Sequence, residues 1–169
     1  MGMPKVNLNQ DFKELLLLLN SEKVRYLLLG GYAVNFHGHR RFTGDLDIWV
    51  STDSDNAERL STALQKFGFS KASVLPEHFR EPNRVFQFGR EPVRVDILTG
   101  PSGVDFEECF VRRINASLDD VPVPIISYDD LHTNKQASGR LKDLADVEAL
   151  GKIKSGKKQV KTKRRKKSK

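Results

Sequence analysis

The stretch from Tyr26 to Val50 constrains the fold of this chain more than any other segment. It begins with an apolar run, Tyr26 to Leu29, of the kind found in buried strands. Gly30 and Gly31 interrupt this run, and a helix-compatible piece and a polar turn follow them. The stretch ends on Asp45-Leu46-Asp47-Ile48-Trp49-Val50, whose alternation predicts a second strand.

Asp45 and Asp47 are expected on one face of this strand, because successive side chains of a strand alternate between its two faces. Two like charges so close together repel each other unless a cation lies between them. Carboxylate oxygens suit Mg²⁺, which fills its shell with water and substrate phosphates. Glycine lets the backbone approach a ligand closely, so Gly30 and Gly31 predict a phosphate-binding turn beside that metal. Taken separately, each motif is also common in proteins as plain structure.

Together these residues resemble the signature of the nucleotidyltransferase fold, the DNA polymerase β superfamily. In this chain the signature consists of Leu29-Gly30-Gly31, thirteen further residues, and then Asp45-Leu46-Asp47-Ile48. With His37-Gly38 and Arg41-Phe42-Thr43-Gly44 included, the stretch is similar to small bacterial members of the superfamily. These members are minimal nucleotidyltransferases and the toxin component of abortive-infection (type IV toxin–antitoxin) systems.

The resemblance implies an α/β (α+β) fold, in which helices flank a small mixed sheet and further helices follow at the C-terminal end. It also implies a third carboxylate from a later strand. Asp96 is the best-placed candidate, because it lies on the strand predicted over 93–98; period two puts Arg94 and Asp96 on one face of that strand. Asp105 is the alternative, but its place at a helix start is explained by N-capping alone.

The resemblance further implies that Lys135 reaches the nucleotide phosphates, while Arg140, Asp143 and Asp146 fasten the last helix to the core. Ordinary pairing of charges on helix surfaces explains these four residues equally well. Arg41 and Thr43 flank the strand of acids and are candidate phosphate contacts. His37, which precedes Gly38, is expected to be a packed histidine at a helix end.

The predicted reaction transfers a nucleoside monophosphate from an NTP to a hydroxyl acceptor and releases pyrophosphate. Asp45, Asp47 and Asp96 are the expected ligands of two Mg²⁺ ions. An RNA 3′ end or a protein is the favoured acceptor, and a small molecule also fits. The resemblance adds a possible toxin role with a cognate antitoxin. The alternative is a catalytically inactive nucleotide- or RNA-binding module of the same fold.

The remaining elements follow from hydrophobic periodicity and turn residues. A short strand is expected over 72–75, and the two prolines of the apolar segment 121–126 predict an edge strand or extended coil. Helices are expected over 11–20, 53–67, 105–110, 127–138 and 141–150, and strands over 84–88, 93–98 and 111–116.

Length and charge divide the chain of 169 residues into one domain, 1–150, and a tail, 151–169. The tail holds nine lysines, two arginines and no acid, so it alone makes the net charge of the chain positive, at +7. This composition predicts disorder, with either nucleic-acid binding or solubility as its role. The single cysteine, Cys109, suits a reducing cytoplasm, and no apolar run is long enough for a membrane span.

Overall fold

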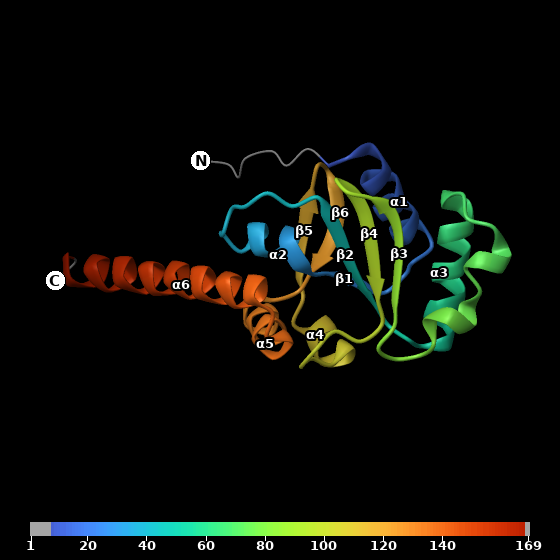
Figure 1. The fold of residues 1–169 in the computed structure, drawn as a ribbon. Helices are drawn as coiled ribbons and strands as arrows, with labels where there is room; N and C mark the ends of the chain where they lie inside the picture. The colour runs from blue at the N-terminus through green and yellow to red at the C-terminus, as the bar shows by residue number, and fades with distance from the viewer. Residues whose placement is uncertain (1–7, 168–169) are drawn as a thin grey trace.

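One mixed sheet forms the centre of the computed structural model, which describes residues 8–167 (Figure 1). Its strands run in the order β3-β4-β2-β1-β6-β5. The central strand β2 is parallel to β4 and antiparallel to β1, while β1 is parallel to β6. In chain order the strands are β1 (Tyr26–Leu28), β2 (Asp45–Val50), β3 (Val85–Arg90), β4 (Val93–Leu98), β5 (Ile114–Leu118) and β6 (Val121–Ile125).

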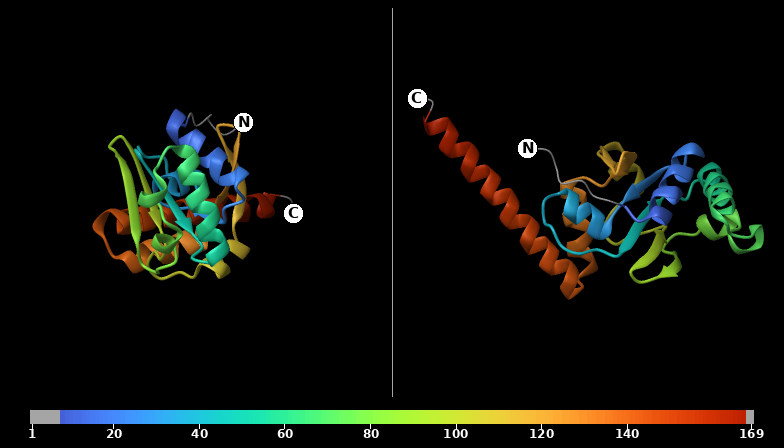
Figure 2. Two further views of the ribbon diagram at one scale, coloured as in Figure 1. Left: turned by 90° about the vertical axis from the view of Figure 1, so that its right-hand side faces the viewer. Right: turned by 90° about the horizontal axis from the view of Figure 1, so that it is seen from above.

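Helices flank this sheet, and side chains that accept hydrogen bonds from backbone amides begin four of them. These N-caps are Asn9, Asp53, Asp105 and Ser127. Figures 1 and 2 show the last helix extending well beyond the sheet. In chain order the helices are α1 (Gln10–Ser21), α2 (Gly30–Phe36), α3 (Ser54–Phe67), α4 (Phe106–Val111), α5 (Tyr128–Ser138) and α6 (Leu141–Lys167), with short 3₁₀ turns at Lys71–Ser73 and Pro76–Phe79.

The two faces of β2 differ in the way that its alternation predicts. Leu46, Ile48 and Val50 are fully buried in the core, together with leucines of α1 and α3. Asp45 and Asp47 lie on the opposite face and are only partly exposed. Burial of one apolar face therefore fixes the direction in which the two acids point, because a shift of one residue would reverse both faces.

The strand β6 lies inside the sheet, so the prediction of an edge strand or coil for 121–126 is wrong. Its prolines are tolerated because β1 pairs with β6 only at its end, where Leu28 is opposite Ile125. Pro122 and Pro124 lie beyond that contact, on a stretch where only β5 is a full partner. This part of an interior strand therefore has the free side that proline requires.

Two further expectations differ from the structure. The strand predicted over 72–75 is replaced by a 3₁₀ turn at Lys71–Ser73, and the strand predicted over 111–116 begins later, at Ile114. α4 accounts for the second difference, because it extends to Val111. Short apolar runs do not distinguish a strand from a turn by periodicity alone.

Residues 151–167 continue α6, whereas the sequence predicts disorder for this segment. Lysine, arginine and glutamine are good helix formers, and extending an existing helix adds one hydrogen bond for each residue that is ordered. Lys154 also bonds Asp129 of α5 at 3.1 Å (Nζ to Oδ1). Among residues 8–167, no helix combines the length and the apolar character that a membrane crossing requires. The division into a domain at 1–150 and an extension at 151–169 stays a prediction.

Asn56 gives a test of how the strands are fastened to α3. Its buried side chain bonds the amide and carbonyl of Arg25 and the carbonyl of Ser51, at 2.7, 3.1 and 2.9 Å. We expect Asn56→Ala to lower the free energy of unfolding by about 3 kcal/mol, because buried backbone groups lose their partner. Urea unfolding measures this, with Asn115→Ala on the exposed face of β5 as the control. Equal stability of the two variants would contradict this account.

Candidate active site

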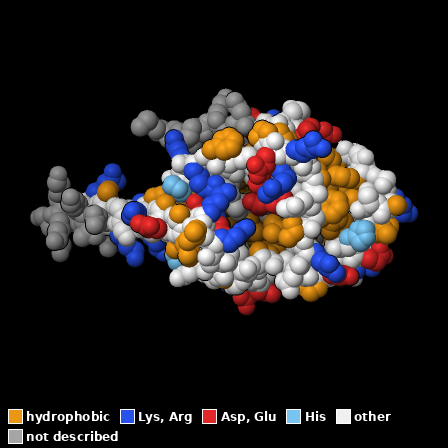
Figure 3. Space-filling model, in the orientation of Figure 1, with side chains coloured by type: hydrophobic (Ala, Val, Ile, Leu, Met, Phe, Trp, Pro, Cys, Tyr) orange, Lys and Arg blue, Asp and Glu red, His pale blue; other side chains and the backbone are white. Residues whose placement is uncertain are grey.

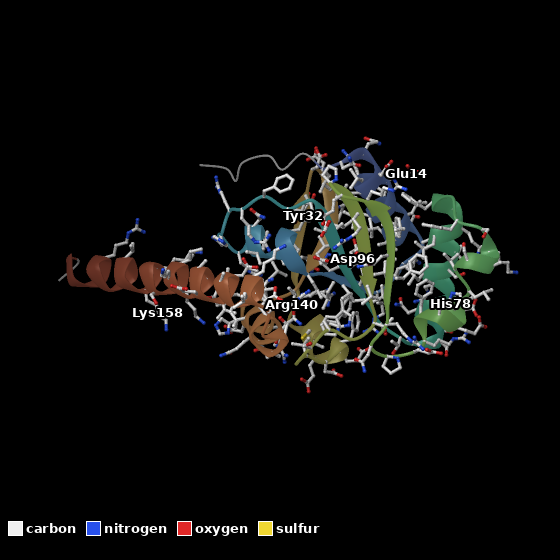
Figure 4. All side chains as sticks on the ribbon, in the orientation of Figure 1. Glu14, Tyr32, His78, Asp96, Arg140 and Lys158 are labelled. Carbon is white, nitrogen blue, oxygen red and sulfur yellow. The ribbon has the colours of Figure 1, made fainter. Side chains whose placement is uncertain are left out.

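Three carboxylates lie on one face of the two central parallel strands. In the pairing of β2 with β4, Asp47 is opposite Asp96 and Asp45 is opposite Arg94. Residues in register on neighbouring strands point to the same face, as do residues two apart on one strand. The structure therefore brings together Asp45, Asp47 and Asp96, the three predicted acids. Figure 4 labels Asp96 on the sheet, between the helices of the two ends.

Asp47 has the most perturbed electrostatics of the three. Burial raises the pKa of its carboxyl, and the negative charges of Asp96 and Asp45 raise it further, from an ordinary 3.8 to about 6. The positive charges of Lys135 and Arg94 act in the opposite direction but do not cancel this effect. Any positive charge added near Asp47 therefore stabilises the ionised form of its carboxylate.

Arg94 supplies part of that charge and is the site residue that the sequence analysis did not single out. Its Nη2 lies 2.8 Å from Asp45 Oδ2, and its Nε lies 3.1 Å from Asp96 Oδ1. Period two along β4 already placed Arg94 on the face of Asp96. The missing signal was the register of β4 against β2, which puts Arg94 beside Asp45 as well.

The three acids provide oxygen atoms of the kind that bind a divalent cation, and one of these atoms has no hydrogen-bond partner in the part of the chain that the structure describes. Oδ1 of Asp45 is buried and accepts no hydrogen bond from the described residues. No group of three or more His, Cys, Asp or Glu side chains within 8–167 is spaced to hold a metal ion in this conformation. The guanidinium of Arg94 lies between Asp45 and Asp96 and contacts both carboxylates. The ligand chemistry therefore fits Mg²⁺, provided that Arg94 makes room.

The glycine pair lies against this face. Gly30 has φ +60°, and a Cβ at this position would lie 1.9 Å from Asp47 Oδ2. A Cβ on Gly31 would lie 2.3 Å from Thr43 Oγ1. Only glycine allows both contacts, so the turn, Asp47 and Thr43 form one closely packed unit. The amides of Gly30 and Gly31 also belong to the first turn of α2, where backbone N–H groups have no acceptor within the helix.

A second charge cluster joins α5 and α6 to the loop before β2. Nζ of Lys135, which is only 5% exposed, lies 2.8 Å from Asp143 Oδ1 and 2.9 Å from Asp146 Oδ2. Asp146 also accepts two hydrogen bonds from Arg41, at 2.9 and 3.0 Å. Burial alone would raise the pKa of Asp143, but hydrogen bonds from Lys135 and Ser138 lower it to about 2. Figure 4 shows Arg140, which also bonds Asp143 (Nε to Oδ2, 2.9 Å), near the junction of the two helices.

This cluster changes the interpretation of two predicted phosphate contacts. Lys135 and Arg41 are both engaged with acids of α6, and Asp143 and Asp146 fasten the helix as the sequence analysis expected. Arg41 nevertheless lies beside Gly31, since its Nη1 is 3.3 Å from where a Cβ would be. Phosphate roles for Lys135, Arg41, Thr43, Gly30 and Gly31 stay predictions.

Two residues weighed in the sequence analysis have structural roles in the fold. Asp105, the alternative third acid, caps α4 by accepting a hydrogen bond from Glu108 N. His37 ends α2, and its Nε2 lies 2.8 Å from the carbonyl of Ile126. Burial lowers the pKa of His37, and its Nε2–H donates to that carbonyl, which can only accept.

A cleft of about 1470 Å³ opens next to the glycine turn. Its walls come from α2, the loop 37–43, the β5–β6 turn and the start of the exposed part of α6. The lining mixes aromatic rings, such as Tyr32 and Phe36, with basic and acidic side chains. Figure 3 shows blue and red side chains meeting at the middle of one face of the molecule. Asp45, Asp47 and Asp96 are not among the residues that line this cleft, which is connected to the acid strand through Thr43.

Comparison with known proteins gives one family. The family model described as Aminoglycoside-2''-adenylyltransferase matches residues 11–150. No curated protein matches the chain significantly.

Solved structures agree in fold at low sequence identity. The lincosamide antibiotic adenylyltransferase LnuA, with lincomycin bound, is 16% identical, with a TM-score of 0.53 over 88% of this chain and 99% of that one. The antibiotic-resistance factor ANT(2'')-Ia is 13% identical, with a TM-score of 0.54 over 90% of this chain and 86% of that one. A proposed nucleotidyltransferase from Thermotoga maritima is 16% identical, with a TM-score of 0.51 over 86% and 91%. The predicted nucleotidyltransferase fold is confirmed.

The raised pKa of Asp47 gives a testable pH dependence. Its folded pKa of about 6 exceeds the ordinary 3.8, so its contribution to stability is complete below pH 3.8 and is lost as the pH rises through 6. Without divalent metal, Asp47→Asn should raise the free energy of unfolding at pH 7 by about 3 kcal/mol and leave it unchanged at the acid end. Urea unfolding in EDTA, from about pH 3.5 to about pH 7, measures this difference in stability. Glu14→Gln, an exposed acid on α1, is the control, and a gain independent of pH would refute the assignment.

Proposed function

This chain belongs to the Aminoglycoside-2''-adenylyltransferase family, and we propose that this nucleotidyltransferase uses Mg²⁺ to transfer a nucleoside monophosphate from an NTP to a hydroxyl group. The observation that carries the proposal is the register of β2 against β4, which gathers Asp45, Asp47 and Asp96 on one face. These acids are the proposed ligands of two Mg²⁺ ions. Bound Mg²⁺ neutralises triphosphate charge and lowers the pKa of the acceptor hydroxyl.

The chain's own groups orient the reactants in this proposal. The amides of Gly30 and Gly31 hold the triphosphate, and the hydroxyl of Thr43 lies close enough to the turn to contact the same phosphates. Arg41 and Lys135 add positive charge behind the turn, although both are bound to Asp146. Catalysis in this reaction class is mainly positioning and electrostatic stabilisation, so these rigid contacts are the relevant contribution.

The acceptor is proposed to enter through the cleft beside the glycine turn. The family description and the antibiotic-bound relatives favour a small molecule with free hydroxyls, and we take this class first. The RNA 3′ end and the protein hydroxyl favoured by the sequence are the other acceptors to test. A toxin role, a cognate antitoxin and a cytoplasmic location stay predictions.

Transfer of label tests the activity. Wild-type protein with Mg²⁺ and each α-labelled NTP in turn should label one acceptor among tobramycin, lincomycin, bulk RNA and bulk protein. Asp45→Asn should reduce the rate by at least about 100-fold, because the nucleotide loses charge stabilisation in the transition state. Glu14→Gln should retain the full rate, and EDTA should abolish it.

The outcomes separate the two functions that remain. Equal label transfer by wild-type protein and by Asp45→Asn would show that Asp45 is not part of the site. Binding of an NTP by wild-type protein without transfer to any acceptor class would favour the inactive binding module instead.

We also propose that residues 151–167 of α6 bind nucleic acid. This segment carries ten lysines and arginines and no acid along about 25 Å of helix, at 1.5 Å per residue. A helix that binds a membrane surface needs an apolar face, and the large apolar residues here are only Ile153 and Val160. The density of charge matches a phosphate backbone, so the expected binding is independent of sequence and sensitive to salt.

Removal of residues 155–169 tests this second proposal and leaves Ile153 and Lys154 in place against the body. The full chain should bind labelled single-stranded RNA or duplex DNA with a slope of about −3 to −5 in log K against log salt. The truncated chain should lose this affinity and its salt dependence while melting at the same temperature. Fluorescence anisotropy at several salt concentrations measures binding, with neutral and anionic vesicles as a parallel arm. Unchanged RNA and DNA affinity after truncation would rule out the proposal, and so would binding of the vesicles alone.

A further inference from the structure

Arg94 occupies the space between two of the three acids. Its Nη2 lies 2.8 Å from Asp45 Oδ2 and 3.3 Å from Asp96 Oδ2, and its Nε lies 3.1 Å from Asp96 Oδ1. One guanidinium therefore contacts three oxygens of two carboxylates. A cation bound between Asp45 and Asp96 would have to share this space with the guanidinium.

We infer that Arg94 is a built-in counter-cation of the acid cluster that competes with the divalent ion and gives way when this ion binds. The inference rests on the proposed metal site at Asp45 and Asp96. A guanidinium and a divalent ion placed between the same two carboxylates would occupy the same space and repel each other, so binding of one disfavours the other. Arg94 therefore acts on metal affinity through the carboxylates and is a positioning residue.

Arg94 provides hydrogen bonds to only some of the carboxylate oxygens of the cluster, as Asp45 shows. Arg94 bonds Oδ2 of this carboxylate, while Oδ1 is buried and accepts no hydrogen bond from the residues described. An unpaired buried carboxylate oxygen is unfavourable, and the guanidinium has no donor placed to reach it. A divalent cation that ligates Asp45 removes this deficiency, which gives it an advantage over Arg94.

Glu91 provides a second position for the displaced guanidinium. Its Oε1 already lies 3.5 Å from Arg94 Nη1, and its side chain is 71% exposed on the turn between β3 and β4. The Arg94 side chain is itself 32% exposed, so turning toward Glu91 requires no movement through the core. Arg94 can therefore exchange its buried partners for an exposed one while it stays at the edge of the site.

This arrangement predicts opposite effects at the two residues. Removal of Arg94 frees Asp45 and Asp96 for the metal. When no metal is bound, the negative charges of the acids then lack the positive charge that balances them. Removal of Glu91 leaves the guanidinium without its outer partner and so holds Arg94 more firmly in the site. The second effect should vanish once Arg94 is gone, because Glu91 acts through Arg94.

The test is a Mn²⁺ titration of the folded full-length chain, followed by calorimetry and by electron paramagnetic resonance of free Mn²⁺. Arg94→Gln should bind Mn²⁺ at least about tenfold more tightly than wild type, which corresponds to about 1.4 kcal/mol. In EDTA the same variant should melt at a lower temperature than wild type, and saturating Mn²⁺ should raise its melting temperature more. Arg90→Gln makes the same charge change on the neighbouring strand and should leave both quantities near the wild-type values.

Glu91→Gln completes the cycle. It should weaken Mn²⁺ binding several-fold in the wild-type background and have no effect in the Arg94→Gln background. Arg94→Lys replaces Arg94→Gln if the glutamine variant does not fold, and it should bind Mn²⁺ more tightly because a single ammonium cannot bridge both carboxylates as the guanidinium does.

Each contrary result overturns the inference in a recognisable way. Equal or weaker Mn²⁺ binding by Arg94→Gln, with normal binding by wild type, would show that Arg94 supports the carboxylates and does not compete. An equal gain in Arg90→Gln would show a general effect of charge. An absence of Mn²⁺ binding in wild type and in every variant would remove the proposed metal site together with the inference.

Discussion

Mutual repulsion of three carboxylates is the constraint around which this structure is arranged. The parallel register of β2 and β4 places Asp47 beside Asp96, and period two adds Asp45 to the same face. Such a group is unfavourable in a folded protein unless positive charge balances it. The chain provides this balance at two distances: Arg94 contacts the acids directly, and Lys135 acts on Asp47 through space.

Lys135 also connects the acid face to the C-terminal helices. It is a buried cation that bonds Asp143 and Asp146, and Asp146 holds Arg41 of the loop that precedes β2. A buried pair of this kind is costly to break, because the remaining charge has no partner. The position of α6 is therefore coupled to the loop that carries Thr43 and leads into Asp45. The basic helix α6, which is far from β2 in sequence, is therefore held at the edge of the candidate site by the contacts of Asp143 and Asp146.

How far the sequence predicts this arrangement depends on whether a feature is local. The shared face of Asp45 and Asp47, the cap at Asp105 and the end of α2 at His37 follow from patterns within a few residues. The choice of Asp96 over Asp105 needed the family resemblance. The pairing of Arg94 with Asp45 depends on register between strands far apart in sequence, which no local pattern contains. The interior place of β6 likewise depends on how short β1 is, since its prolines by themselves favour an edge.

Gly30 connects the two halves of the candidate site, which are the glycine turn and the acid cluster. Its left-handed backbone turns the chain over Asp47, so close that a Cβ would overlap Oδ2. The same approach buries the Asp47 carboxylate, and burial is the largest cause of its raised pKa. The turn that we propose to bind phosphate therefore also creates an electrostatic demand that the proposed divalent cation would satisfy. Because a bound metal would relieve the charge that the turn buries, the two proposed ligands are expected to favour each other's binding through Asp47.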